Sequence, residues 1–345
     1  MELLKIEKMR RFYEIFPYPN RPLIVLPKIE AQFTAHGGFG FGIALGKTNI
    51  AYTIWKLSND FSVFGGYANK KEWLCIFVEL KNLFSDEKRI LLVGCGTDEP
   101  VLFRKLHPKN EIIAIDLSRK AIEKAKKKIS FLKIANFITK RVKTSKIEFL
   151  QGNAEVILNE KALGKFDFIQ CFGVLHHQPD PLPLFSAMAQ KLNSGGVLRL
   201  MVYSFHGRKL ERRIQTRYQN IWSGFFQKKH FRFKILSHYA LLRFWQFFNF
   251  LGFFASSRKR FYYLGAGSVS VADAFMHPSD PGIPLNLINE MAKKLELEMI
   301  YCEGKLEDRG YVLGFDDPIS TWNKIVEADE KQELLTNPII IFRKV

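Results

Sequence analysis

Cysteine is scarce in this chain, and no two cysteines have the spacing of a metal or redox site. The four cysteines among 345 residues, Cys75, Cys95, Cys171 and Cys302, are widely separated and form no CxxC pair. Their spacing argues against a zinc ribbon and against a disulfide-rich secreted domain. We therefore expect a reduced, cytoplasmic protein that uses no metal.

Long uncharged apolar runs are also lacking. Charged residues occur throughout residues 1–10, which leaves no apolar core for a signal peptide. The most apolar stretch, Ile235–Ala255, contains Arg243 near its centre, and a central arginine is costly in hydrocarbon. We therefore predict no transmembrane helix, whereas peripheral attachment through a helix lying on the membrane surface stays open.

Acidic residues are outnumbered by basic ones, 34 to 52, which gives a formal net charge of +18. Such a field favours anionic partners, namely nucleic acid, phosphorylated metabolites or an acidic membrane surface. A basic surface without a specific partner is as good an interpretation. Apolar residues make up 47% of the chain, which predicts a folded core.

The middle of the chain alternates short apolar runs with helical patterns, which predicts parallel strands joined by crossover helices. The expected strands are Ile90–Val93, Glu111–Asp116, Ile147–Gln151, Phe166–Cys171 and Gly196–Tyr203, followed by closing strands at Glu296–Cys302 and Pro338–Lys344. The expected helices are Pro100–Leu106, Arg119–Ile129, Glu155–Glu160, Pro181–Leu192 and Leu285–Leu295.

Two glycines, Gly94 and Gly96, follow the first of these strands and flank Cys95. Glycine there permits a tight turn and lets a ligand lie against the backbone, and the following helix offers free N–H groups. A dinucleotide-binding turn would have a further glycine where Glu99 stands. The pattern therefore argues against NAD and FAD.

Polar residues follow the next two strands. Asp116 ends the second strand, where a carboxylate accepts hydrogen bonds from a ribose diol, although it could simply cap the next helix. Asn153 and Ala154 follow the third strand, where a side chain can contact an adenine edge. After the fourth strand come Phe172 and Gly173 and then a pair of histidines.

Taken together and in this order, these motifs resemble the class I S-adenosylmethionine-dependent methyltransferases, over about residues 88–204. The resemblance implies a doubly wound, Rossmann-like α/β fold with a seven-stranded, mostly parallel sheet. It also implies S-adenosyl-L-methionine as the cofactor. The residues implied to bind it are Gly94, Cys95, Gly96, Asp116, Leu117, Asn153, Ala154, Phe172 and Gly173. Residues 1–87 would be an N-terminal accessory segment, 205–283 an aromatic and basic cap insertion, and 284–345 the rest of the core.

Weaker likeness extends to a bacterial subgroup often fused to tetratricopeptide repeats. It is carried by Tyr13 and its neighbours, by Tyr203 with Arg208, and by the run from Asp273 to His277. The chain departs from the superfamily where an acid is common before the first glycine, because Leu92 stands there. It departs again where a third glycine is common, because Asp98 stands there.

Three histidines are candidate catalytic bases, His176 and His177 after the fourth strand and His277 in the cap insertion. Methyl transfer needs mainly alignment of the acceptor with the sulfonium, and a base only for an unactivated OH or NH. Helix capping and turn packing are therefore the simpler interpretation of these histidines.

The cap insertion is rich in Lys, Arg and aromatic residues, and Glu211 is the only acid between Gly207 and Arg260. It could form a lid over the active site, lie on anionic lipid or hold single-stranded nucleic acid. We favour the lid, because the insertion follows the strand next to the ligand crevice of an open α/β sheet. The expected acceptor is an O, N or C atom of a small or lipid-like molecule. The alternatives are RNA methylation and a non-catalytic binding protein.

Overall fold

The computed structural model describes most of the predicted core. The described residues are 2–18, 88–106, 109–138, 145–160, 162–209, 212–213, 215–216, 237, 240, 272–273, 275–307, 310–314, 317–334 and 337–345. Most of the predicted accessory segment and most of the cap insertion thus lie outside the described residues. The domain boundaries and the lid therefore stay predictions.

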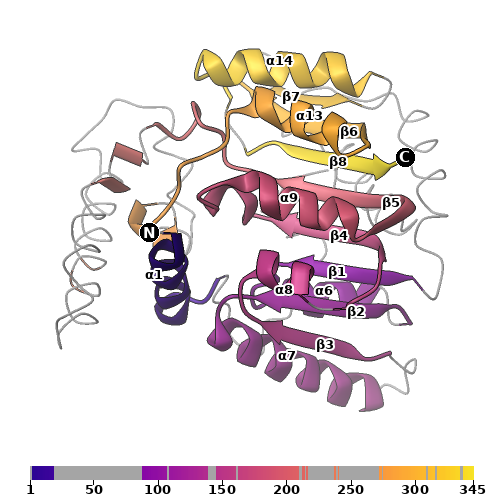
Figure 1. Ribbon diagram of the computed structural model, residues 1–345. Coiled ribbons are helices and arrows are strands. Elements are labelled where there is room, and N and C mark those ends of the chain that lie inside the picture. The colour runs from indigo at the N-terminus through magenta and orange to yellow at the C-terminus, as the bar shows by residue number, and fades with distance from the viewer. Residues whose placement is uncertain are drawn as a thin grey trace.

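One sheet of eight strands, in the order β3-β2-β1-β4-β5-β8-β6-β7, forms the centre of the described structure (Figure 1). The strands are β1 (Arg89–Val93), β2 (Glu111–Asp116), β3 (Ile147–Gln151), β4 (Phe166–Phe172), β5 (Leu192–Met201), β6 (Leu297–Leu306), β7 (Gly310–Gly314) and β8 (Ile339–Lys344). Strands β1 to β5 pair in parallel. Strand β8 runs antiparallel to both β5 and β6, and β7 runs antiparallel to β6.

This order confirms the predicted doubly wound, mostly parallel α/β fold, but the sheet has one strand more than the seven predicted. The additional strand is β7, a short run between Gly310 and Gly314. A Cβ atom at Gly314 would lie 2.9 Å from Cys302 Sγ and 2.9 Å from Thr321 Cβ. Glycine here permits close packing of the strand against its neighbours.

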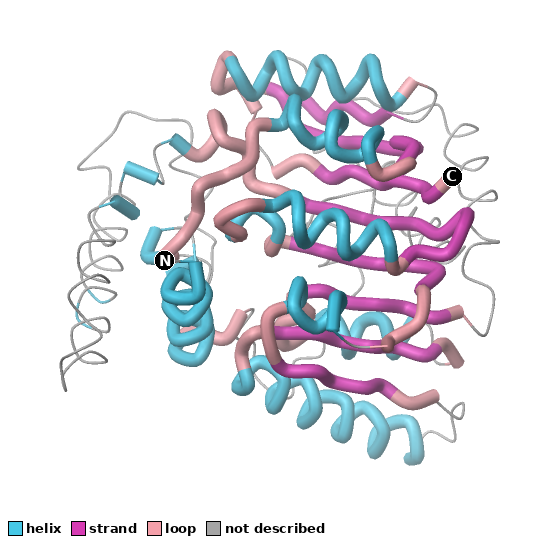
Figure 2. The backbone as a smooth tube through the Cα atoms, in the orientation of Figure 1, coloured by secondary structure: helices cyan, strands magenta, loops and turns pink. Residues whose placement is uncertain are grey.

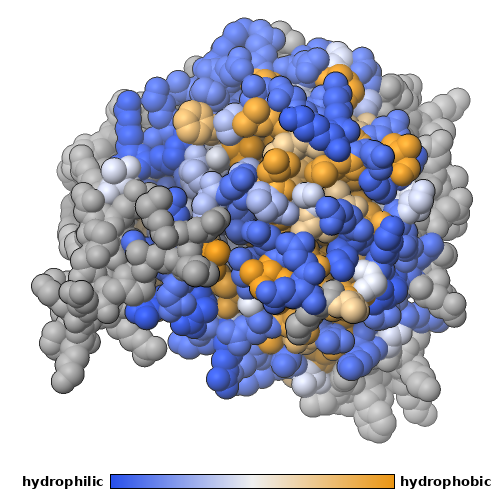
Figure 3. All heavy atoms as spheres, in the orientation of Figure 1, coloured by the Kyte–Doolittle hydropathy of each residue, from blue (hydrophilic) through white to orange (hydrophobic). Residues whose placement is uncertain are grey.

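Helices cover both faces of the sheet (Figure 1). They are α6 (Glu99–Leu106), α7 (Arg119–Ile138), α8 (Ala154–Glu160), α9 (Pro181–Gln190), α13 (Leu285–Lys294) and α14 (Pro318–Glu330). Helices α8, α9, α13 and α14 share one continuous apolar core with the sheet. Figure 3 shows hydrophilic side chains over much of this face, with apolar side chains grouped among them. On the other face, Phe103 of α6 packs against Phe168 of β4.

The fifth strand begins earlier than predicted. The sequence of Asn193 to Gly196 predicts a helix stop and a turn, yet these residues belong to β5, which starts at Leu192. The pairing of β4 with β5 shifts register between Phe166 and Phe168, and Gly195 has a φ of 73°. The glycines therefore make an irregular start to the strand.

An N-terminal helix that the sequence did not predict, α1 (Glu2–Ile15), lies beside the carboxyl ends of the parallel strands (Figure 1). Glu14 Oε1 accepts a hydrogen bond from the backbone N–H of Arg119, with a distance of 2.6 Å. Because Arg119 is the first residue of α7, the carboxylate meets the positive end of that helix. No helix within the described ranges is long and apolar enough to cross a membrane.

Candidate active site

The turn after β1 is bound to the end of β2. Val93 pairs with Ile115 of β2 and with Cys171 of β4, so the three strands end at the same level. The backbone N–H groups of Gly94 and Cys95 both donate to the Ile115 carbonyl, at 2.9 and 3.0 Å. The loops that follow the parallel strands therefore gather at one edge of the sheet (Figure 2).

Gly94 has a φ of 69° and allows no side chain. An added Cβ atom would lie 2.1 Å from Cγ2 of Val174, in the loop after β4. Both the left-handed backbone and this close approach require glycine. The motif thus joins β1, β2 and the β4 loop tightly.

Asp116 is held by two backbone N–H groups. Its Oδ2 accepts from Gly96 at 2.8 Å and its Oδ1 from Ser118 at 2.7 Å. Burial raises the pKa of Asp116 to about 6, against these two hydrogen bonds, which lower it. The carboxylate lines the cavity and has lone pairs left that can accept further hydrogen bonds.

Asn153 lies at the start of α8. Its Oδ1 accepts from the backbone N–H of Glu155 at 3.1 Å, as in a helix N-cap. The amide nitrogen of the same side chain offers two donors for a ligand. After β4, Gly173 has a φ of 74° and its N–H donates to the Met201 carbonyl at 3.2 Å.

All nine residues predicted to bind the cofactor line one cavity: Gly94, Cys95, Gly96, Asp116, Leu117, Asn153, Ala154, Phe172 and Gly173. They come from the ends of β1, β2, β3 and β4, which is where ligands bind in open α/β sheets. The sequence did not assign several further lining residues to the site. They include Ile6, Met9, Tyr13, Tyr18, Asp98, Glu99, Gln178, Met201, Tyr203 and Asp273.

The cavity is acidic although the chain is strongly basic. Its described lining includes Asp98, Glu99, Asp116 and Asp273, and no Lys or Arg. Lys128 Nζ forms an ion pair with Asp98 Oδ1 at 2.5 Å, and both side chains are 1% exposed. Burial raises the pKa of Glu99 to about 8, so this side chain is protonated at neutral pH. The acids of the described lining that are left are Asp116 and Asp273, beside no Lys or Arg, and they favour a cationic ligand.

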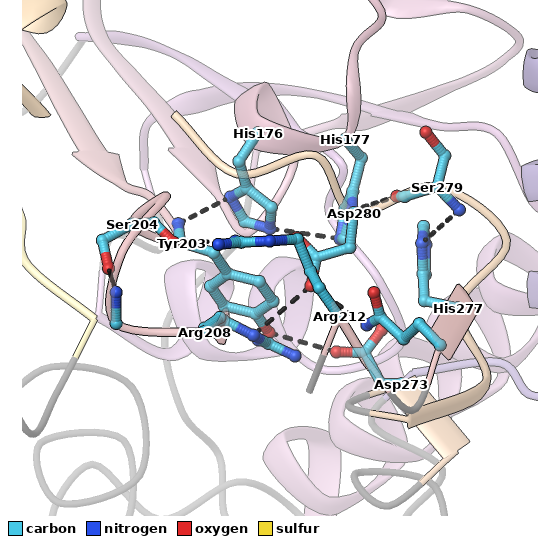
Figure 4. A network of polar contacts seen from close by, with 12 residues as sticks. His176, His177, Tyr203, Ser204, Arg208, Arg212, Asp273, His277, Ser279 and Asp280 are labelled. Carbon is cyan, nitrogen blue, oxygen red and sulfur yellow. Dashed lines mark hydrogen bonds and ion pairs between the residues drawn. The ribbon is translucent and has the colours of Figure 1, made fainter. Parts of the chain in front are cut away.

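The three candidate histidines are buried in a hydrogen-bonded network next to the cavity (Figure 4). The backbone N–H of Tyr203 donates to His176 Nδ1 at 3.0 Å, so the proton of neutral His176 is on Nε2. That nitrogen lies 3.1 Å from His177 Nε2, and His177 Nδ1 lies 2.8 Å from the Ser279 carbonyl. His177 thus accepts a hydrogen bond from His176 and donates one to Ser279.

His277 continues the network. The backbone N–H of Ser279 donates to His277 Nδ1 at 3.1 Å, and the His277 ring stacks on that of His177 with centroids 3.8 Å apart. Burial lowers the pKa of all three histidines, so each is held neutral. Among them, only His177 belongs to the described lining of the cavity. A catalytic role for these histidines stays a prediction, and the structure gives each of them a packing role.

The same network contains two groups of described residues that could hold a metal ion. His176, His177 and Asp280 form one, and His177, Asp273 and His277 form the other, with ligand atoms within 4.8 Å of one another in each group. His177 is common to both, and both of its ring nitrogens are used in hydrogen bonds. A metal ion at either group would have to replace one of these hydrogen bonds.

Asp273 connects this network to the cavity. Its two carboxylate oxygens accept hydrogen bonds from the hydroxyls of Tyr13 and Tyr203, each at 3.1 Å. Burial and the Asp273 charge raise the pKa of both tyrosines well above the ordinary value, so both keep their protons. These residues belong to the weaker motifs that resemble the bacterial subgroup, which was the signal available in the sequence.

A family model described as a methyltransferase domain matches residues 70–250. Because this is more than half of the 345 residues, the chain belongs to that family. The predicted superfamily is thus confirmed, and S-adenosylmethionine is the cofactor of that superfamily.

Individual relatives match only part of the chain. It is 35% identical over 128 residues to an uncharacterized protein of Synechococcus sp., covering 37% of this chain and 28% of that protein. It is 33% identical over 144 residues to the tRNA U34 carboxymethyltransferase of Nautilia profundicola, covering 41% of this chain and 43% of that protein. A solved structure of PKMT2 from Rickettsia typhi is 17% identical with a TM-score of 0.49, covering 74% of this chain and 49% of that one. The chain spans less than half the length of each of these three proteins.

Proposed function

We propose that this chain binds S-adenosylmethionine in the cavity and transfers its methyl group to an O, N or C atom of a small or lipid-like acceptor. The observation that carries the proposal is the convergence of the nine predicted cofactor residues around one cavity. The Gly94 turn would accommodate the methionine part and sugar, Asp116 the ribose hydroxyls, and Asn153 and Ala154 the adenine. Phe172 and Gly173 would lie beside the sulfonium.

The chemistry asks little of the protein beyond alignment. Bound S-adenosylmethionine would supply a methyl carbon on a positively charged sulfur, and an aligned acceptor would take this carbon while the sulfur kept the electron pair. Positioning of the two reactants can lower such a barrier by about 7–11 kcal/mol. An acidic cavity also suits the cofactor, whose sulfonium and ammonium groups are cationic.

Calorimetric titration with S-adenosylmethionine and S-adenosylhomocysteine tests the cofactor site. We expect both to bind, and Asp116→Ala to weaken binding by about tenfold or more, since a charged hydrogen-bond acceptor is lost. Asp317→Ala is the matched control, because Asp317 caps α14 through the N–H of Ser320 and is not a lining residue. Absence of binding by the wild-type protein would overturn the proposal, and binding without any methyl transfer would indicate a non-catalytic binding protein.

RNA is the second candidate acceptor. It is favoured by the net charge of +18 and by the similarity to the tRNA U34 carboxymethyltransferase over part of the chain. Binding to RNA through many phosphates weakens steeply as salt rises. A steep salt dependence of RNA affinity, with radiolabelled methyl transfer into RNA, would support this candidate over the small acceptor.

A further inference from the structure

One part of the cavity is not explained by the cofactor motifs. Tyr13 comes from α1, Tyr203 follows β5, and Asp273 precedes the segment that carries His277. All three line the cavity. The two tyrosine hydroxyls converge on the single carboxylate of Asp273, and Figure 4 shows the contact from Tyr203. Three distant segments of the chain thus build one polar group at the cavity.

The direction of these hydrogen bonds determines what this group can bind. Each tyrosine uses its proton to donate to Asp273, so each hydroxyl oxygen presents only lone pairs to the cavity. The carboxylate is itself an acceptor with lone pairs left over. A ligand group that meets Tyr13, Tyr203 and Asp273 must therefore donate hydrogen bonds.

The charge of the cavity lining further restricts the kind of ligand group that fits. The described lining of the cavity contains no Lys or Arg. The Arg208 guanidinium lies over the Tyr203 ring at 3.7 Å. Its charge is balanced by Asp280, outside the described lining, because Arg208 Nε forms an ion pair with Asp280 at 3.3 Å. Tyr18 adds another aromatic ring to the same lining. An anionic, aromatic and acceptor-rich site favours a cation that carries N–H groups.

We propose that Tyr13, Tyr203 and Asp273 form the acceptor subsite, and that the acceptor presents an amino nitrogen to it. This inference rests on the proposed function, which allows an O, N or C atom as the methyl acceptor, and it selects the nitrogen. The ammonium group of the acceptor binds at the carboxylate and loses one proton to solvent before reaction. The nitrogen lone pair then forms the N–C bond while the C–S bond breaks and the sulfur keeps its electron pair. The products are S-adenosylhomocysteine and an N-methylammonium ion, whose positive charge Asp273 stabilises.

Matched small probes test the subsite separately from the cofactor site. The protein, saturated with S-adenosylhomocysteine, is titrated with butylammonium, butanol and butyrate, which share a chain and differ in the head group. We expect butylammonium to bind about tenfold or more tightly than the other two, because only it can satisfy a charged acceptor. Similar binding of the three probes, or binding of none of them, would overturn the inference.

Substitutions assign the preference to these residues. Asp273→Asn should abolish the preference for butylammonium while the protein still binds S-adenosylhomocysteine, and Asp317→Asn, at the cap of α14, should change neither binding. If Asp273→Asn does not fold, as judged by its thermal unfolding, Tyr203→Phe is the second variant. It removes one of the two groups that hold Asp273 and should weaken butylammonium binding by about threefold or more. An unchanged preference in the variant that folds would contradict the assignment.

Turnover separates failure of this inference from failure of the proposed function. Radiolabelled S-adenosylmethionine is supplied with butylamine, butanol and butyrate. If the wild-type protein does not bind S-adenosylhomocysteine, the proposed function fails. If it binds and methylates the hydroxyl or carboxylate probe as readily as the amine, only the amino-nitrogen acceptor is excluded.

Discussion

The backbone N–H of Gly96 donates a hydrogen bond to Oδ2 of Asp116 at 2.8 Å, and this bond joins the two sharpest motifs of the sequence. The glycine turn after β1 and the acid after β2 are separate features of the chain, yet each fixes the other. The second oxygen of the carboxylate is fixed by Ser118 at 2.7 Å. A ligand that hydrogen-bonds to Asp116 thus meets a preorganised acceptor, which reduces the ordering cost of binding.

Cofactor affinity should fall in acid because of Asp116. Burial raises its pKa to about 6, so the carboxylate is charged above that pH and becomes protonated below it. We expect the affinity for S-adenosylhomocysteine to decrease as the pH falls through about 6, and this step to be absent in Asp116→Asn. Glu99→Gln is the control and should keep the step near pH 6, because the pKa of Glu99 is raised to about 8 and this residue titrates in a different range. The same acid step in Asp116→Asn would assign it to another group.

Gly94 should tolerate no side chain, for two separable reasons. In Gly94→Ala the new Cβ atom would overlap Val174 Cγ2, at 2.1 Å, and the φ of 69° is strained for alanine. We expect loss of cofactor binding and a lower thermal stability, with part of the stability restored in Gly94→Ala/Val174→Ala. Gly195→Ala is the matched control, because its φ is 73° and nothing lies within 4 Å of the added atom. It should cost about 1 kcal/mol from backbone strain alone and leave binding intact.

Much of the core could be predicted from the sequence because it depends on local patterns. Strands such as β2 are apolar runs that are buried in the sheet, and glycine or acid residues mark the points where β1 and β2 end. Parallel strands bring these ends to one edge, so the cofactor residues could be grouped without knowing the strand order.

The missed features depend on contacts between distant segments. Tyr13 and Asp273 are 260 residues apart, and Glu14 reaches Arg119 across 105 residues. No periodicity connects such pairs, so the weaker motifs around Tyr13 and Asp273 gave no sign that these residues meet at the cavity. Strand β7 was missed because it has only five residues and begins and ends with glycine, which has a low strand propensity.

The buried ion pair between Lys128 and Asp98 should be sensitive to loss of one partner. Both side chains are 1% exposed, and Asp98 Oδ1 also accepts from Thr97 Oγ1 at 3.1 Å. Lys128→Met leaves a buried carboxylate without its cation, and we expect unfolding in urea to show a loss of about 3–5 kcal/mol. Lys128→Met/Asp98→Asn should lose less than Lys128→Met alone, because no unpaired charge is left behind. A double variant as unstable as the single one would mean that the charge is not the cause.

The histidine network should make the folded protein sensitive to acid. Burial lowers the pKa of His176, His177 and His277 below 6.5 in the folded state, whereas the unfolded chain takes up protons near that pH. The unfolded state therefore binds more protons as the pH falls, and stability decreases by up to about 1.4 kcal/mol per pH unit for each histidine. His277→Asn keeps an acceptor near the N–H of Ser279 but cannot titrate. The slope of the unfolding free energy against pH, measured in urea between about pH 6.5 and 5, counts the protons taken up on unfolding. We expect this number to be smaller by about one in the variant than in the wild type. Equal slopes would show that His277 is protonated in the folded protein, and hence that the network is not held neutral.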